Sequence, residues 1–320
     1  MNKFINKIIP GQAMVILDRM PSESVDCIIT SPPYWALRDY GVSGQLGLEP
    51  TFSEYITKLC NIFDEVKRVL KKTGTCFVNI GDTYYGGGRN KGNKNPHPKG
   101  VRRLGAQSVQ TPAPVGVDKC LAQIPSRFAI EMANRGWILR NEIIWHKPNC
   151  MPSSVKDRFT VDFEKVYFFV KSKKYNFKTQ YEPFISNDYD KARMANAREV
   201  HGGKWADNSG GAIKTQRAFV AGNKEGRTKR CVWSICTKPF PSAHFATFPE
   251  ALVEPMIKAG CPEGGAVLDP FMGAGTTAVV AKKLGRNFIG IDLNWDYVEM
   301  ARERVNAVPV SLFANNLITK

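Results

Sequence analysis

Residues 266–281 read A-V-L-D-P-F-M-G-A-G-T-T-A-V-V-A, and residues 290–294 read G-I-D-L-N. In the first stretch an apolar run ends at Asp269, a glycine loop follows, and a helical pattern begins near Thr276. The second stretch closes another apolar run, which predicts the next strand. A strand, a tight glycine loop, a helix and a further strand form the repeating unit of parallel α/β sheets.

Two glycines and one acid in these stretches predict a ligand. Gly273 and Gly275 let a ligand approach the backbone closely, and the helix that follows offers free N–H groups. Asp292 ends the next expected strand, where a carboxylate suits the two hydroxyls of a ribose. The loop lacks the full G-x-G-x-x-G phosphate cradle and any G-K-[ST], so it favours a nucleoside without a pyrophosphate. An ordinary α/β turn is the alternative interpretation.

Strand and helix patterns alternate through much of the remaining chain. Thr51 and Glu54 form a capping box at the start of the helix expected over Phe52–Leu70, and Gly74 is expected to stop it. The other expected elements are the strands Val25–Thr30, Thr75–Ile80, Ile138–Trp145, Val161–Val170, Ala266–Leu268 and Asn287–Ile291, and the helices Leu121–Ala133 (closed by Gly136), Thr276–Leu284 and Trp295–Val305. The alternation predicts an α/β fold with a doubly wound, mostly parallel sheet.

Length and composition are those of a globular protein. The chain has 320 residues, of which 43% are hydrophobic and 23% charged, enough for one large domain or two modest ones. Its apolar stretches are strand-sized, so we expect no membrane span, and Pro10 interrupts the apolar run that a secretory signal would need. The eight cysteines form no C-x-x-C pair and there are only four histidines, which argues against a zinc site and a disulfide framework. We therefore expect a cytoplasmic protein without a metal.

The charge of the chain indicates a polyanionic partner. Lys and Arg number 45 against 29 Asp and Glu, a net charge of +16. The segment 86–103 holds six basic and no acidic residues, and the segment 187–230 holds ten basic and five acidic ones. Both are rich in Gly and Asn and poor in periodic apolar residues, which is typical of loops that contact phosphates. Nucleic acid is the favoured partner, and a solvated basic surface is the alternative.

A second motif, T-S-P-P-Y-W at residues 30–35, follows the strand expected at Val25–Thr30. Its two prolines fix an extended turn and lack N–H donors, which leaves carbonyls free to accept hydrogen bonds. Ser31 adds a hydroxyl acceptor and Tyr34 an aromatic face. This set suits a planar ring that carries an amino group, whereas the plainer interpretation is a proline turn after a strand.

Taken in order, these motifs resemble those of the DNA amino-methyltransferases, which modify the exocyclic amine of cytosine or adenine. The resemblance is to the permuted (beta) class, in which the S/D-P-P-Y motif precedes the S-adenosylmethionine loop. M-P-S-S-V-K-D-R (Met151–Arg158) and H-F-A-T-F-P (His244–Pro249) also look like family blocks, so the resemblance covers nearly the whole chain. It implies a Rossmann-like methyltransferase fold with S-adenosylmethionine as the only cofactor. The implied organisation is a catalytic half at 1–186 with a mobile basic loop at 86–118, a target-recognition insert at 187–231, and a cofactor-binding half at 232–320.

The resemblance also implies the site residues. The catalytic residues would be Ser31, Pro32, Pro33 and Tyr34. The cofactor-binding residues would be Asp269, Phe271, Gly273, Gly275, Thr276, Thr277, Asp292, Phe245, Thr247 and Gln12. One departure concerns the last of these, because the family usually has Gly-Asp where this chain has Gly-Gln. A Gln carbonyl could still accept a bond from the adenine amine of the cofactor.

The expected reaction needs hydrogen-bond acceptors at the target amine, whose lone pair is delocalised into the base. By resemblance, the Ser31 hydroxyl and the Pro32 carbonyl accept from the two N–H bonds, and the freed lone pair attacks the sulfonium methyl. The target base must be flipped out of the duplex, and Tyr34 would stack on it. Trp35 is expected in the core instead. Three residues that end the strand Thr75–Ile80 or follow it are expected to face the same pocket: Asn79, Gly81 and Asp82. The alternative interpretation of Asp82 is that it caps a turn.

Several alternatives remain open in the sequence. Ser before P-P-Y favours cytosine N4, while adenine N6 presents the same geometry. Cytosine C5 methylation is not expected, since the chain has no Pro-Cys dipeptide. Other substrates of P-P-Y methyltransferases are RNA and protein glutamine, and an inactive DNA-binding relative is a further alternative. The expected partners are double-stranded DNA and a cognate restriction endonuclease, for a monomer or homodimer of bacterial, archaeal or phage origin.

Overall fold

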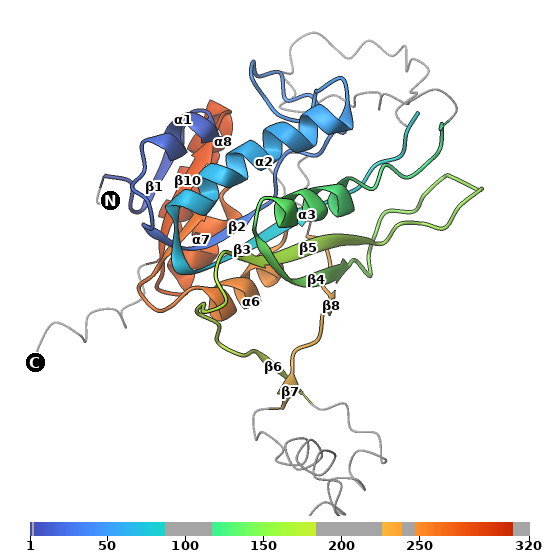
Figure 1. Ribbon diagram of the computed structural model, residues 1–320. Helices are drawn as coiled ribbons and strands as arrows, with labels where there is room; N and C mark the ends of the chain where they lie inside the picture. The colour runs from blue at the N-terminus through green and yellow to red at the C-terminus, as the bar shows by residue number, and fades with distance from the viewer. Residues whose placement is uncertain (2, 87–116, 184–225, 239–246, 310–320) are drawn as a thin grey trace, which may run out of the picture. The chain divides into compact units, whose positions relative to one another are not determined.

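An eight-stranded sheet organises most of the chain in this computed structural model, with the order β1-β10-β9-β2-β3-β5-β4-β8 (Figure 1). The strands are β1 (Lys7–Pro10), β2 (Val25–Thr30), β3 (Leu70–Ile80), β4 (Ile138–His146), β5 (Phe163–Val170), β8 (Val232–Ser234), β9 (Ala266–Asp269) and β10 (Asn287–Asp292). All neighbours from β1 to β3 pair parallel, as do β4 and β8, whereas β5 runs antiparallel to β3 and β4. The predicted doubly wound, mostly parallel sheet is confirmed.

Helices cover both faces of this sheet. They are α1 (Ala13–Asp18), α2 (Phe52–Val69), α3 (Ile124–Asn134), α6 (Glu250–Gly260), α7 (Thr276–Lys283) and α8 (Trp295–Asn306). Apolar residues of α1, α2 and α3 form one core, and those of α6, α7 and α8 form a second. In β2 the side chain of Ile28 joins the first core while Cys27 and Ile29 join the second, because successive strand residues point to opposite faces.

The structure describes residues 1, 3–86, 117–183, 226–238 and 247–309. By contacts the chain divides into two units, Met1–Lys178 with Cys231–Lys320 and, separately, Thr179–Arg230. Most of the basic loop predicted at 86–118 and of the insert predicted at 187–231 lies outside the described residues.

The described part of the second unit is a short antiparallel pair. Its strands are β6 (Tyr181–Glu182) and β7 (Arg227–Thr228). The Glu182 carboxylate accepts from Arg227 Nε at 2.8 Å and from Arg230 Nε at 2.9 Å. Burial acts to raise the pKa of Glu182, but the hydrogen bonds from Arg230 and Arg227 outweigh it and lower the pKa.

Helix α2 begins as predicted but ends earlier. The Thr51 hydroxyl accepts from the Glu54 amide at 3.2 Å, which confirms the N-terminal cap. The stop predicted at Gly74 is wrong, because the helix ends at Val69 and Gly74 lies inside β3. The last helical carbonyls have other partners: Ser24 N donates to Val69 O at 2.7 Å. No glycine cap is needed, since the amides of the segment that leads into β2 donate to these carbonyls.

Other boundaries differ by a few residues. Helix α3 starts at Ile124 instead of Leu121, because Leu121 forms a bridge with Tyr84 and Pro125 occupies the first turn. Four elements of the main sheet and its helices were not predicted: β1, β8, α1 and α6. The last of these carries Pro255 inside the helix, which obscures its pattern.

No helix among the described residues has both the length and the apolar character that a bilayer crossing requires.

Candidate active site

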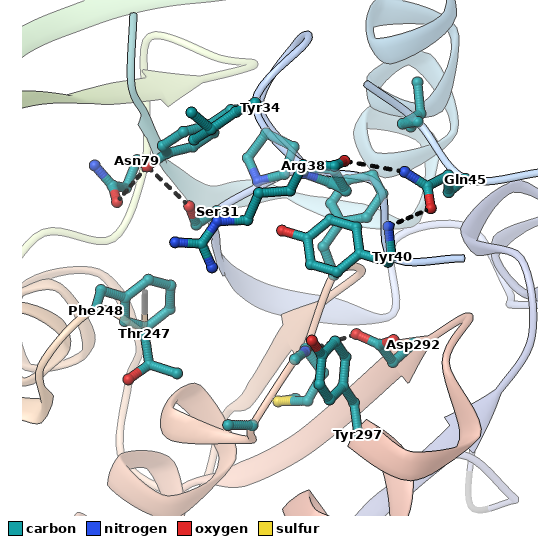
Figure 2. A pocket seen from close by; sticks show the side chains of 18 of the residues that line it. Ser31, Tyr34, Arg38, Tyr40, Gln45, Asn79, Thr247, Phe248, Asp292 and Tyr297 are labelled. Carbon is teal, nitrogen blue, oxygen red and sulfur yellow. Dashed lines mark hydrogen bonds between the residues drawn. The ribbon is translucent and has the colours of Figure 1, made fainter. Parts of the chain in front are cut away.

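A cavity of about 990 Å³ opens at the carboxyl ends of the parallel strands (Figure 2). Segments that follow β1, β2, β9 and β10 line it together with Asn79 near the end of β3, which is the usual position of ligands in open α/β sheets. The predicted site residues that line it are Gln12, Ser31, Pro32, Pro33, Tyr34, Thr247, Phe271, Gly273, Thr276 and Asp292. Asp269, Gly275 and Thr277 lie outside the lining, and Phe245 lies outside the described residues. One cavity thus joins both predicted motifs.

Asp292 and the glycine loop form one side of this cavity. The Gly273 amide donates to Asp292 Oδ2 at 2.7 Å, and the Asn294 amide donates to Oδ1 at 2.9 Å. Burial raises the pKa of Asp292. Gly273 has φ +51°, and a Cβ there would meet no atom within 4 Å. The absence of a side chain therefore leaves the cavity open beside the carboxylate.

Gly275 serves a different purpose from Gly273. It is the N-cap of α7 in the left-handed conformation, with φ +83°. A Cβ at this position would lie 2.7 Å from Cβ of Ala301 in α8. Gly275 thus permits α7 and α8 to pack closely, and its contact with a ligand stays a prediction.

Asp269 lies fully buried beneath the loop and connects the two motifs. Its Oδ1 accepts from Thr30 Oγ1 at 2.6 Å and from the Phe271 amide at 3.1 Å, and its Oδ2 accepts from Thr277 Oγ1 at 2.7 Å. Burial raises the pKa of Asp269 to about 6, against the lowering effect of these hydrogen bonds. Because Thr30 directly precedes Ser31, this carboxylate connects the S-P-P-Y turn to the glycine loop.

Aromatic residues line the cavity near Asp292, and sequence reasoning missed them. The rings of Tyr40 and Tyr297 meet edge to face at 6.2 Å between centroids. Phe248 also lines the cavity, next to the predicted Thr247. Its place in the block His244–Pro249 was an available signal, whereas Tyr40 lies in an irregular segment without a recognisable pattern.

The S-P-P-Y turn forms the other side of the cavity, with Asn79 close by (Figure 2). Ser31 Oγ donates to the Tyr34 hydroxyl at 3.3 Å, and this hydroxyl donates to Glu164 Oε2 at 2.7 Å. Lys147 and Glu164 form an ion pair there. Neither Lys147 nor Glu164 was predicted, since single charged residues in strand regions carry no sequence motif.

The remaining predictions near this turn have mixed outcomes. Asn79 lines the cavity as expected. Gly81 does not line it, but a Cβ on Gly81 would lie 2.5 Å from the Tyr34 ring, so the glycine makes room for that ring. The placement of Asp82 in the pocket is wrong. Its Oδ1 accepts from the Thr83 and Ile124 amides at 2.9 and 3.0 Å, which caps α3. Trp35 is buried in the core as expected.

Comparison with known proteins gives the family. The sequence model of the N6/N4 methyltransferase family, described as DNA methylase, matches residues 25–303. The chain belongs to this family. It is 41% identical over 300 residues to the type II methyltransferase M.SmaI of Serratia marcescens, covering 93% of this chain and 90% of that protein. It is 42% identical over 296 residues to M.Cfr9I of Citrobacter freundii, covering 92% and 86%.

Solved structures agree on the fold. The PvuII DNA methyltransferase, named as cytosine-N4-specific, superposes with a TM-score of 0.60 at 19% identity, over 93% of this chain and 85% of that one. A putative DNA modification methylase of Thermus thermophilus, complexed with S-adenosyl-L-methionine, gives 0.56 at 22% identity, over 95% of each chain. At these identities the likeness concerns the fold alone.

For a DNA methylase the two sides of the cavity have distinct chemical capacities. The Asp292 side offers a carboxylate, an open glycine loop and aromatic faces. The Ser31 side offers hydroxyl, carbonyl and amide oxygens. Among the described residues there is no group of three or more His, Cys, Asp or Glu side chains that could hold a metal ion.

Proposed function

We propose that this DNA methylase transfers a methyl group from S-adenosylmethionine to the exocyclic N4 amine of a cytosine flipped out of duplex DNA. One observation carries the proposal: Gly273 and Asp292 line the same cavity as Ser31 and Tyr34. A cofactor site and an amine-binding site that share a cavity can hold the two reactants in line, which contributes up to roughly 7–11 kcal/mol in favourable cases.

The Asp292 side fits the cofactor. The carboxylate oxygens keep lone pairs beyond the two backbone amides they accept, and these would bind the ribose hydroxyls. Gly273 leaves space for close approach, and Tyr40 and Tyr297 supply apolar walls for a nucleoside. Gln12 lines the cavity and would accept from the adenine amine. S-adenosylmethionine supplies an electrophilic methyl on a sulfonium, and the residues here bind and orient it.

The Ser31 side would bind the amine of the target base. The Ser31 hydroxyl and the Pro32 carbonyl accept the two N–H bonds, which draws the nitrogen toward a tetrahedral geometry and frees its lone pair. The Pro33 carbonyl already accepts from the Tyr55 hydroxyl at 2.8 Å, an interaction that fixes the turn. Tyr34 presents its ring for stacking on the flipped base.

The choice of DNA as the substrate and the choice of cytosine as the target base rest on separate observations. The net charge of +16 suits a phosphate backbone, and the relatives are named type II methyltransferases. Within that class we favour cytosine because the motif begins with Ser31. A cognate restriction endonuclease is the partner that a type II methyltransferase would have.

The test is to incubate the protein with labelled S-adenosylmethionine and unmethylated genomic DNA, digest to nucleosides, and identify the product by mass spectrometry. N4-methylcytosine is expected, and Ser31→Ala should abolish it. Ser53→Ala is the control, since Ser53 is exposed on α2 and lies outside the cavity lining. N6-methyladenine would refute the choice of base. Retained cofactor binding without any methylated nucleoside would refute DNA as the substrate.

A further inference from the structure

A chain of hydrogen bonds runs from the catalytic serine to an ion pair in the cavity wall. Ser31 Oγ lies 3.3 Å from the Tyr34 hydroxyl, and this hydroxyl lies 2.7 Å from Glu164 Oε2. Asn79 Nδ2 donates to the same Glu164 oxygen at 3.1 Å, and Lys147 Nζ donates to Oε1. Asn79 belongs to β3, Glu164 to β5, and the S-P-P-Y turn follows β2, so the sheet itself fixes their spacing.

The direction of these bonds follows from what each group can donate. The Tyr34 hydroxyl has one proton and two acceptors, Glu164 Oε2 at 2.7 Å and Asn79 Oδ1 at 3.3 Å. Because the carboxylate is both nearer and charged, the proton goes to Glu164. Burial and the neighbouring Glu164 carboxylate raise the pKa of Tyr34 well above its usual value, so the hydroxyl keeps that proton. The Tyr34 oxygen is then an acceptor toward Ser31, and the Ser31 proton points at Tyr34. The remaining lone pairs of Ser31 are free to accept from another donor.

We propose that Glu164 is a positioning residue that sets the Ser31 hydroxyl as a hydrogen-bond acceptor for the target amine. The proposal rests on the proposed function and deepens it. A serine hydroxyl can donate as well as accept, and donation to the amine nitrogen would engage the lone pair that must attack. Glu164 accepts the Tyr34 proton, so Tyr34 can only accept from Ser31. The Ser31 hydroxyl then cannot donate to the amine, although Glu164 itself does not contact the substrate.

Lys147 and Asn79 hold Glu164 in this role. The side chains of Lys147 and Glu164 are only 18% and 19% exposed, so their ion pair is screened little by water. The Lys147 ammonium also lies over the Trp145 ring, at 4.3 Å from its centroid. Because Lys147 can only donate, it engages one carboxylate oxygen and leaves the other for Tyr34 and Asn79.

Glu164→Gln tests the direction of the chain with little change of shape. Lys147 would attract the amide oxygen of Gln, so the NH₂ group would face the Tyr34 oxygen as a donor. Tyr34 would then give its proton to Ser31 or Asn79, which reverses the chain. We expect kcat to fall roughly 10- to 100-fold, the scale of one hydrogen bond to a charged group. KM for DNA and for S-adenosylmethionine should stay unchanged. Glu142→Gln is the control, because Glu142 pairs with Lys165 outside the cavity lining.

A double-mutant cycle with Tyr34→Phe separates this role from a merely structural one. Without the Tyr34 hydroxyl the chain is broken, so adding Glu164→Gln should reduce kcat no further. Equal losses in both backgrounds would overturn the proposal, as would wild-type kcat in Glu164→Gln. If Glu164→Gln does not fold by circular dichroism, Tyr34→Phe alone should show the same loss of kcat at unchanged KM, and full activity would overturn the proposal. Wild-type protein that methylates no DNA would refute the proposed function instead.

Discussion

Replacing Asp269 with Asn should remove a specific pH dependence from the stability of this protein. The carboxyl is fully buried, and burial raises its pKa to about 6, whereas an unfolded Asp titrates near 3.9. The ionised form is therefore disfavoured in the folded state. The stabilisation that comes from keeping Asp269 neutral in the folded state is complete below about pH 4 and is lost as the pH rises through 6. A difference of about two pKa units corresponds to about 3 kcal/mol.

The assay is urea unfolding of wild type and Asp269→Asn at intervals from pH 4 to pH 7.5. Glu131, Asp157 and Glu182 have lowered pKa values from ion pairs, and their stabilisation is lost toward acid pH in both proteins. Subtracting the two curves cancels that trend. Relative to the variant, the wild type should lose about 3 kcal/mol between pH 4 and pH 7. The variant's altered hydrogen bonds to Thr30 and Thr277 add an offset that does not depend on pH. A flat difference, or one of opposite sign, would refute the reasoning.

Three further predictions concern single positions. Gly275→Ala should lower the free energy of unfolding by roughly 2–5 kcal/mol in a urea titration, since its Cβ would lie 2.7 Å from Ala301 in a left-handed conformation. Gly285→Ala is the control: it has φ +68° but no atom within 4 Å of a Cβ, so it should cost only about 1 kcal/mol. Gly273→Ala should leave stability within about 1–2 kcal/mol but weaken S-adenosylmethionine binding by calorimetry, because its methyl enters the cavity. Thr51→Ala should lower the free energy of unfolding by about 1 kcal/mol through loss of the α2 cap, and no change would show that solvent replaces it.

The sequence predicted the fold where periodicity and local chemistry agree. The glycine loop between β9 and α7 and the apolar face of α2 each specify their element without help from distant residues. The end of α2 could not be predicted, because its last carbonyls bond to a segment far away in the chain, at Ser24. Gly74 was predicted to end the helix because the partner of the last carbonyls, Ser24, is far away in the sequence and no local pattern indicates it.

The candidate site shows the same division. Motif residues such as Ser31 and Asp292 line the cavity as expected. Lys147 and Glu164 were missed because each is a lone charge whose partner lies on another segment, and only the sheet brings them together. Asp82 was misplaced for a related reason: a carboxylate at a strand end suggests a ligand, while its actual partner is the first amide of α3, at Ile124, in a distant segment.

The place of β9 beside β2 has a consequence for synthesis on the ribosome. Thr30 and Asp269 bond across 239 residues of chain, and β1 pairs with β10 over an even longer separation. At a translation rate of roughly 5–20 residues per second, β9 is made on the order of 10–50 s after β2. During that interval an apolar strand edge is open to other nascent chains. A product terminated before residue 266 would carry the S-P-P-Y turn without the strand that anchors it. The β2 edge therefore stays without its β9 partner until translation has passed residue 269.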